Sequence, residues 1–133
     1  MRSKFSRIIS GTMTWGEWGK QLSQKEMTDL IEATVGLGIT SFDHADIYGG
    51  YTTEADFGAA FTQSTIPREK VTFISKCGIQ YPSEMRPLAV KHYDYSADHI
   101  CMGTRIFKTT VLCSANQARN QAKDASPKPT TTL

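Results

Sequence analysis

Short apolar runs and helical repeats alternate along the first hundred residues. The runs Phe5–Thr12, Ile39–Asp43 and Val71–Lys76 are short and rich in β-branched or aromatic residues, and each predicts a β-strand. Gly11 marks the end of the first run. The third run is apolar enough to indicate a strand that is buried on both faces of a sheet.

Helical patterns fill the intervals between these strands. Ser23 and Glu26 have the spacing of a capping box, and the next apolar positions recur at helical spacing until Gly36 and Gly38 stop the pattern. Those apolar positions are Met27, Leu30, Ile31 and Val35. A second helix is predicted to open at Thr53–Asp56, with Phe57, Ala60 and Phe61 on one face, and a third at Ser96–His99. Strands that alternate with helices predict an α/β fold, in which helices cover a parallel sheet through right-handed crossovers.

Ionisable side chains stand at the ends of two predicted strands. Asp43 is the last residue of the second strand, and Lys76 is the last residue of the third. The carboxyl ends of parallel strands meet at one edge of a sheet, where α/β proteins place their active sites. Tyr48 follows in a loop that contains Gly49 and Gly50, so it can fold back over that edge. We therefore expect Asp43, Tyr48 and Lys76 to converge.

Such a trio is suited to proton transfer. A phenol with a pKa of about 10 is a weak proton donor near neutral pH, and a neighbouring ammonium ion strengthens it. A carboxylate can hold that ammonium in place, so the tyrosine can protonate a carbonyl oxygen as hydride reaches the carbonyl carbon. Taken singly, each residue has a structural interpretation, since a strand-ending aspartate commonly caps a helix and an edge lysine commonly lies in solvent.

Composition adds limits to this picture. The chain has 133 residues, of which 39% are hydrophobic and 21% are charged, as in an ordinary single domain. No apolar run is long enough to span a membrane, and the N-terminus lacks the pattern of a secretory signal. Cys77, Cys101 and Cys113 show no C-x-x-C spacing, which favours a reducing, cytoplasmic location. Asp43, His44 and Asp46 could suggest a metal site, but adjacent strand residues point to opposite faces, so we expect none.

The charge is distributed unevenly. Residues 1–100 hold 10 basic and 12 acidic side chains, whereas residues 101–133 hold 5 basic side chains and one acidic side chain. The net charge of +2 therefore comes from the tail alone. A basic tail could touch nucleic acid, but a solvated or unstructured tail is the simpler interpretation, and we expect no nucleic-acid or membrane partner.

Two segments carry a family resemblance. Phe42–Gly50, with the sequence FDHADIYGG, resembles the Asp…Tyr-Gly block of the aldo-keto reductases, and Ile74–Lys76 resembles the strand-ending lysine of that family. The longer match, DHADIYGGY followed by SKCGI, is similar to a bacterial subgroup of reductases of unassigned substrate. The resemblance covers about residues 5–100.

This resemblance implies a (β/α)8 barrel and the NADP(H)-dependent reduction of a small aldehyde or ketone. Asp43, Tyr48 and Lys76 match three of the four catalytic positions of the family, with Tyr48 as the general acid. The first-strand loop that lies beside the nicotinamide in the family is matched by Gly11, Thr12, Met13 and Trp15. A loop of this composition is also common as packing.

Departures from the family pattern are equally informative. The fourth catalytic residue of the family is a histidine that ends the next strand, but His44, His92 and His99 all precede the place of that strand. A complete barrel of this kind takes about 250 residues. We therefore expect a truncated barrel of about three βα units in residues 5–100, followed by a divergent, poorly ordered tail in residues 101–133.

Two functional hypotheses follow from these features. The first is a reductase by descent that has little or no activity in this chain alone. The second is a non-catalytic module that associates through its open sheet edges, with itself or with a full-length relative.

Overall fold

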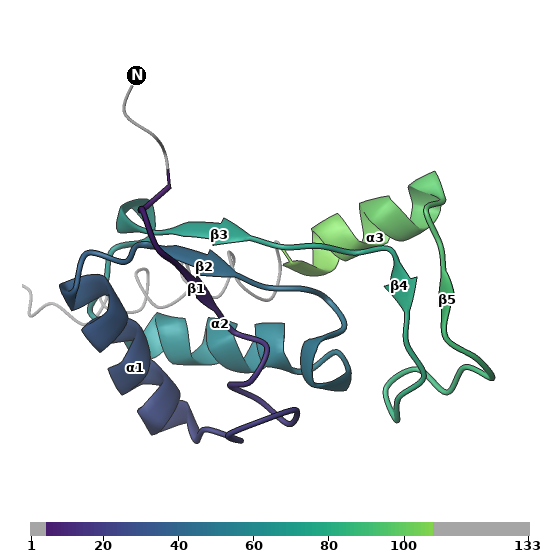
Figure 1. Ribbon diagram of the computed structural model, residues 1–133, viewed down its shortest axis with the longest axis horizontal. Helices are drawn as coiled ribbons and strands as arrows, with labels where there is room; N and C mark the ends of the chain where they lie inside the picture. Colours follow the sequence, from purple (N-terminus) through teal and green to yellow (C-terminus); the bar gives the residue numbers. More distant parts are fainter. Residues whose placement is uncertain (1–4, 108–133) are drawn as a thin grey trace, which may run out of the picture.

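Three short parallel strands form the sheet of this protein (Figure 1). The computed structural model describes residues 5–107. The strands are β1 (Ile9–Gly11), β2 (Ser41–Asp43) and β3 (Thr72–Ile74), in the spatial order β1-β2-β3. Helix α1 (Gln24–Gly36) connects β1 to β2, helix α2 (Thr53–Gln63) connects β2 to β3, and both lie on the same side of the sheet. The predicted α/β alternation is confirmed, and the sheet of the described residues is an open one.

The strand register brings the predicted site residues to one edge. Gly11 pairs with Asp43, and Asp43 pairs with Ile74. Backbone pairing continues past the strands, since the His44 amide donates to the Ile74 carbonyl at 2.8 Å and the Asp46 amide donates to the Lys76 carbonyl at 3.0 Å. The chain after β2 thus stays attached to the chain after β3, which holds Lys76 beside the end of β2.

Each strand is shorter than its predicted run. At the start of β1 and β2, the Ser6 side chain takes the place of part of the backbone ladder. The Ser6 hydroxyl oxygen accepts hydrogen bonds from the amides of Thr40 and Ser41, at 3.1 and 3.0 Å, and the Ser6 amide donates to Ser41 Oγ at 3.0 Å. The segment before β1 therefore contacts β2 without regular strand pairing.

Helix α1 begins at the predicted capping box. Ser23 Oγ accepts from the Glu26 amide at 3.3 Å, and the Glu26 carboxylate accepts from the Ser23 amide at 2.8 Å. The helix ends at Gly36, and Gly38 then adopts a φ of +82°, which a residue with a side chain rarely tolerates. The helix start and stop signals predicted from the sequence are confirmed.

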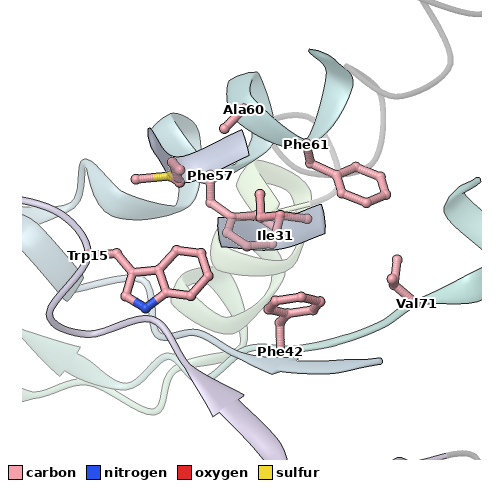
Figure 2. Close-up of a cluster of buried hydrophobic side chains, with 8 residues drawn as sticks. Trp15, Ile31, Phe42, Phe57, Ala60, Phe61 and Val71 are labelled. Carbon is pink, nitrogen blue, oxygen red and sulfur yellow. The ribbon is translucent and has the colours of Figure 1, made fainter. Parts of the chain in front are cut away.

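The core lies between the sheet and the two helices (Figure 2). Phe42 of β2 is fully buried, and the centre of its ring lies 5.3 Å from the ring centre of Phe57 on α2 and 6.3 Å from that of Trp15. The cluster consists of Trp15, Met27, Ile31, Phe42, Phe57, Ala60, Phe61 and Val71. Burial of these large side chains is the main stabilising contribution to the fold.

The prediction that the third strand is buried on both faces is wrong. Residues Thr72, Phe73 and Ile74 are each only partly buried. Phe73 packs on the side of the sheet that the helices cover, with its ring centre 5.4 Å from that of Phe57 and 5.2 Å from that of Phe61. Neighbouring strand residues point to the opposite face, and α1 and α2 cover only one face of the sheet.

An antiparallel hairpin and a third helix follow β3. The hairpin pairs β4 (Ile79–Gln80) with β5 (His92–Tyr93) and was not predicted. Helix α3 (Ala97–Phe107) begins where the sequence indicated, and it continues across the predicted boundary at residue 100. The rest of the predicted tail, residues 108–133, lies outside the described residues. None of the helices in the described range has the length and apolar character needed to cross a membrane.

Candidate active site

Lys76 and Asp43 form the central contact of the site. Lys76 Nζ donates to both carboxylate oxygens of Asp43, at 2.7 and 2.8 Å, and to the backbone carbonyl of His44 at 2.7 Å. These three acceptors match the three donors of an ammonium group. The Lys76 side chain is 51% exposed and that of Asp43 is 34% exposed, so the pair adds little to stability. Its consequence is a fixed position for one positive charge at the sheet edge.

Tyr48 reaches the same edge through a tight turn. It opens the 3-10 helix η1 (Tyr48–Gly50), in which Gly49 and Gly50 have φ angles of +60° and +64°. A Cβ at Gly49 would lie 2.5 Å from Thr53 Oγ1, so the turn requires glycine there. The centre of the Tyr48 ring lies 5.5 Å from Lys76 Nζ. Asp43, Tyr48 and Lys76 are thus brought together, as the strand-end argument predicts.

The four residues of the predicted cofactor loop differ in solvent exposure. Gly11 is exposed with open space around it, and Met13 is 48% exposed. Thr12 is fully buried, and its hydroxyl donates to the Asp43 carbonyl at 3.0 Å. Trp15 is only 8% exposed and packs on Phe57 at 5.9 Å between ring centres. Thr12 and Trp15 thus take part in packing, whereas Gly11 and Met13 are accessible, and cofactor contact stays a prediction for all four residues.

His44, which follows Asp43 in the chain, is a buried residue that supports the site. His44 is fully buried, and its ring centre lies 4.4 Å from that of Phe57. Its Nδ1 lies 3.0 Å from Thr12 Oγ1. Because the Thr12 hydroxyl donates its proton to the Asp43 carbonyl, we assign the Nδ1 proton to His44. Burial lowers the pKa of His44 to about 4; Asp43 acts in the opposite direction and Lys76 reinforces the shift. The neutral ring thus fixes Thr12 and, through it, the end of β2.

Two further acidic residues, Glu54 and Asp46, lie near Lys76, and the sequence did not predict them as part of the site. Glu54 is only 6% exposed and accepts a hydrogen bond from the Ser75 hydroxyl at 2.5 Å. Burial raises the pKa of Glu54, and the nearby Asp46 carboxylate raises it further. Burial also raises the pKa of Asp46, against the opposing effects of Arg86 and His99. The available signal was the position of Glu54 one residue into an amphipathic helix, on the side that faces the sheet.

These residues define what the site can do chemically. A fixed ammonium beside a phenol can stabilise negative charge that develops on the phenolic oxygen. Gly11, which pairs with Asp43, is exposed, and a Cβ built there would meet no atom within 4 Å. In the described part of the chain, no three histidine, cysteine or acidic side chains are grouped so that they could hold a metal ion.

Several known proteins are similar to this chain. The model of the aldo/keto reductase family matches residues 7–104. The uncharacterized oxidoreductase YcsN of Bacillus subtilis is 46% identical over 98 residues, which are 73% of this chain and 32% of that protein. The 6-dehydroglucose reductase of Agrobacterium fabrum is 41% identical over 98 residues, or 73% of this chain and 33% of that protein. The chain thus spans about a third of the length of these curated relatives.

Solved structures share the fold. An aldo-keto reductase of Pseudomonas aeruginosa superposes with a TM-score of 0.64 and 23% identity, over 80% of this chain and 38% of that chain. The aldo-keto reductase AKR11C1 of Bacillus halodurans gives a TM-score of 0.63 and 16% identity, over 90% of this chain and 43% of that chain. The open sheet with its helices is therefore part of the (β/α)8 barrel architecture. Since the family match covers most of its length, this chain belongs to the aldo/keto reductase family of oxidoreductases.

Proposed function

We propose that this protein carries the proton-donating part of an NADPH-dependent carbonyl reductase, which converts an aldehyde or ketone to an alcohol with Tyr48 as the general acid. One observation carries the proposal. Lys76 Nζ is held by both carboxylate oxygens of Asp43 and lies 5.5 Å from the centre of the Tyr48 ring. These contacts hold one positive charge beside a half-buried tyrosine, which is the arrangement that proton donation by Tyr48 requires.

The roles of the three residues follow from their contacts. Tyr48 donates its phenolic proton to the carbonyl oxygen of the substrate, whose carbon gains a hydride, and the products are an alcohol and a tyrosinate. Lys76 stabilises the negative charge on the phenolic oxygen during this transfer. Asp43 fixes the ammonium and leaves it no freedom to turn away. Water then returns a proton to Tyr48.

NADPH is the proposed source of the hydride, which its reduced nicotinamide supplies when bound. Of the four loop residues predicted to contact NADPH, Gly11 and Met13 are exposed. The relative from Agrobacterium fabrum is named as a reductase of 6-dehydroglucose, and we propose the same type of reaction here. The free thiols of Cys77 and Cys101 support a reducing, cytoplasmic location.

We also propose that the 133-residue chain turns over slowly by itself. The loss of one electrostatic contact to the reacting oxygen typically costs a factor of about 100–1000, and the family histidine that would make such a contact has no counterpart before residue 101. The test is a hybrid in which residues 5–100 are joined to the C-terminal portion of the Bacillus subtilis relative. Consumption of NADPH with small aldehydes is measured for the hybrid and for the natural chain. Activity in the hybrid that disappears in Tyr48→Phe supports the proposal; activity that survives this substitution contradicts it.

Self-association is the second candidate function. In the described sheet β1 pairs only with β2, and apolar side chains lie beside its open edge, with Ile8 64% and Ile9 46% exposed. Such an edge is a template for pairing with another chain. Sedimentation velocity at increasing protein concentration tests this proposal, and a single monomeric species throughout would contradict it.

A further inference from the structure

A cavity of about 250 Å³ lies between the first turn of α2, helix α3 and the segment that joins β4 to β5. Asp43, Tyr48 and Lys76 are not among the described residues that line it. Pockets for drug-sized ligands span about 300–1,000 Å³, so this one is suited to a smaller molecule. We call it the α2–α3 pocket.

Most of the wall of the α2–α3 pocket is apolar. Tyr51, Ala55, Met85 and Gly103 contribute to it. At Gly103 a Cβ would lie only 3.2 Å from Cys77 Cβ, so glycine lets α3 approach the end of β3 and close this side of the pocket. An apolar part of a ligand would therefore replace water along most of the wall.

Two buried carboxyl groups interrupt this apolar wall. Oδ2 of Asp46 is buried and has no hydrogen-bond partner in the described part of the chain. Glu54 is only 6% exposed, and its hydrogen bond from Ser75 uses Oε1, which leaves Oε2 without a hydrogen bond from any described residue. The two groups interact, since Asp46 adds to the increase that burial causes in the pKa of Glu54. Buried carboxylate oxygens without donors are costly, so the pocket lacks both hydrogen-bond donors and positive charge.

Arg86 also lines the pocket but does not neutralise these acids by direct contact. Its guanidinium carbon lies 4.0 Å from the centre of the Tyr51 ring, and its Nη1 donates to Gln80 Oε1 at 3.2 Å. Neither Asp46 nor Glu54 takes part in an ion pair within the described range of the chain. Arg86 does lower the pKa of Asp46, but burial has the larger effect and the pKa is raised. Two acids and one occupied cation leave the pocket with an excess of negative charge.

We infer that the α2–α3 pocket binds a small primary ammonium ion whose apolar group packs on Tyr51 and Met85. An ammonium group has three N–H donors and a positive charge, so it can serve both Asp46 Oδ2 and Glu54 Oε2. An alcohol of the same size offers one donor and no charge, and a carboxylate would be repelled. The pocket is separate from Tyr48, so this inference does not rest on the proposed reductase function.

The test follows methionine methyl groups by NMR in the full 133-residue chain. Met85 lines the pocket, whereas Met13 lies in the loop after β1, so their methyl shifts report on two separate places. The two signals are assigned with Met85→Leu and Met13→Leu. Benzylamine, benzyl alcohol and benzoate, which share a ring and differ in charge, are titrated at pH 7. We expect a saturable Met85 shift with benzylamine, binding that is weaker by about tenfold or more with benzyl alcohol, and no binding of benzoate.

Matched variants locate the binding and identify its cause. Ala55→Leu, at an exposed position of α2 that lines the pocket, should fill its mouth and abolish the Met85 shift. Ala59→Leu, at an exposed position one turn further along α2 and outside the pocket lining, should leave benzylamine binding unchanged. The double variant Asp46→Asn/Glu54→Gln should bind benzylamine no better than benzyl alcohol. Circular dichroism checks that each variant is folded.

Several outcomes would overturn the inference. They are a Met85 methyl that benzylamine does not shift, benzyl alcohol that binds as tightly as benzylamine, or equal benzylamine binding by Ala55→Leu and Ala59→Leu. A benzylamine shift confined to Met13 would place the ammonium site elsewhere and would also overturn it. Should the double variant not fold, the comparison of the three ligands on the natural chain decides the role of charge.

Discussion

Acid should destabilise this protein through His44. The ring is fully buried against Phe57 and Phe73, and burial lowers its pKa from 6.5 to about 4. Between these two values the unfolded chain binds a proton that the folded chain does not. The stabilising contribution of the neutral ring is therefore complete above pH 6.5 and is lost as the pH falls towards 4.

The size of the effect follows from the two pKa values. From pH 7 to pH 5 the free energy of unfolding should fall by about 2 kcal/mol, and the full loss below pH 4 should reach about 3 kcal/mol. Asp46 and Glu54 act in the opposite direction, because their raised pKa values make the folded chain the better proton acceptor at mildly acidic pH. A comparison with His44→Asn removes their contribution, since both acids remain in that variant.

Urea denaturation at pH 7, 6 and 5, followed by circular dichroism, measures this difference. The natural chain should lose about 2 kcal/mol more than His44→Asn between pH 7 and pH 5. The imidazole proton shifts of the folded natural chain give the pKa directly, should the variant not fold. Equal pH dependence of the two proteins, or a His44 that titrates at pH 6 or above, would refute the reasoning.

Three further predictions concern the helix cap, the ion pair and the sheet edge. Ser23→Ala removes the capping box and should lower the free energy of unfolding by about 1 kcal/mol in urea, and an unchanged midpoint would contradict the role of the cap. Lys76→Met should cost less than about 1 kcal/mol in the same assay, because the pair with Asp43 is partly exposed, yet it should abolish aldehyde reduction by the hybrid; retained reduction would remove Lys76 from the site. Ile9→Lys places a charge beside the open edge of β1 and should shift any concentration-dependent sedimentation towards the monomer, whereas unchanged association would place the contact elsewhere.

The sequence could predict the site because strand ends are a topological property. Asp43 and Lys76 each end an apolar run, and parallel strands deliver their carboxyl ends to one edge whatever their exact length. The strands are shorter than predicted, yet the residues still converge, since backbone pairing continues beyond them to Asp46 and Lys76. The position of Tyr48 depended on two glycines whose φ angles are positive, and the sequence showed both of them.

Orientation within loops could not be predicted in the same way. Met13 and Trp15 lie two residues apart in one loop, but only the tertiary packing of Trp15 on Phe42 and Phe57 turns it inwards. The β4–β5 hairpin could not be predicted from the sequence, because each of its strands has only two residues, too few to show a period-2 pattern. Burial of a polar residue such as His44 likewise depends on neighbours distant in the sequence.

The central claim is that Tyr48, next to the ammonium that Asp43 fixes, donates the proton in carbonyl reduction. The most direct measurement is the rate of aldehyde-dependent NADPH consumption by the hybrid of residues 5–100 with the C-terminal portion of the Bacillus subtilis relative, compared with its Tyr48→Phe variant. General acid catalysis contributes a factor of about 100–10,000, so kcat/KM should fall by at least about 100-fold while circular dichroism stays unchanged. A Tyr48→Phe hybrid that reduces the aldehyde at the rate of the unsubstituted hybrid would show that another group supplies the proton.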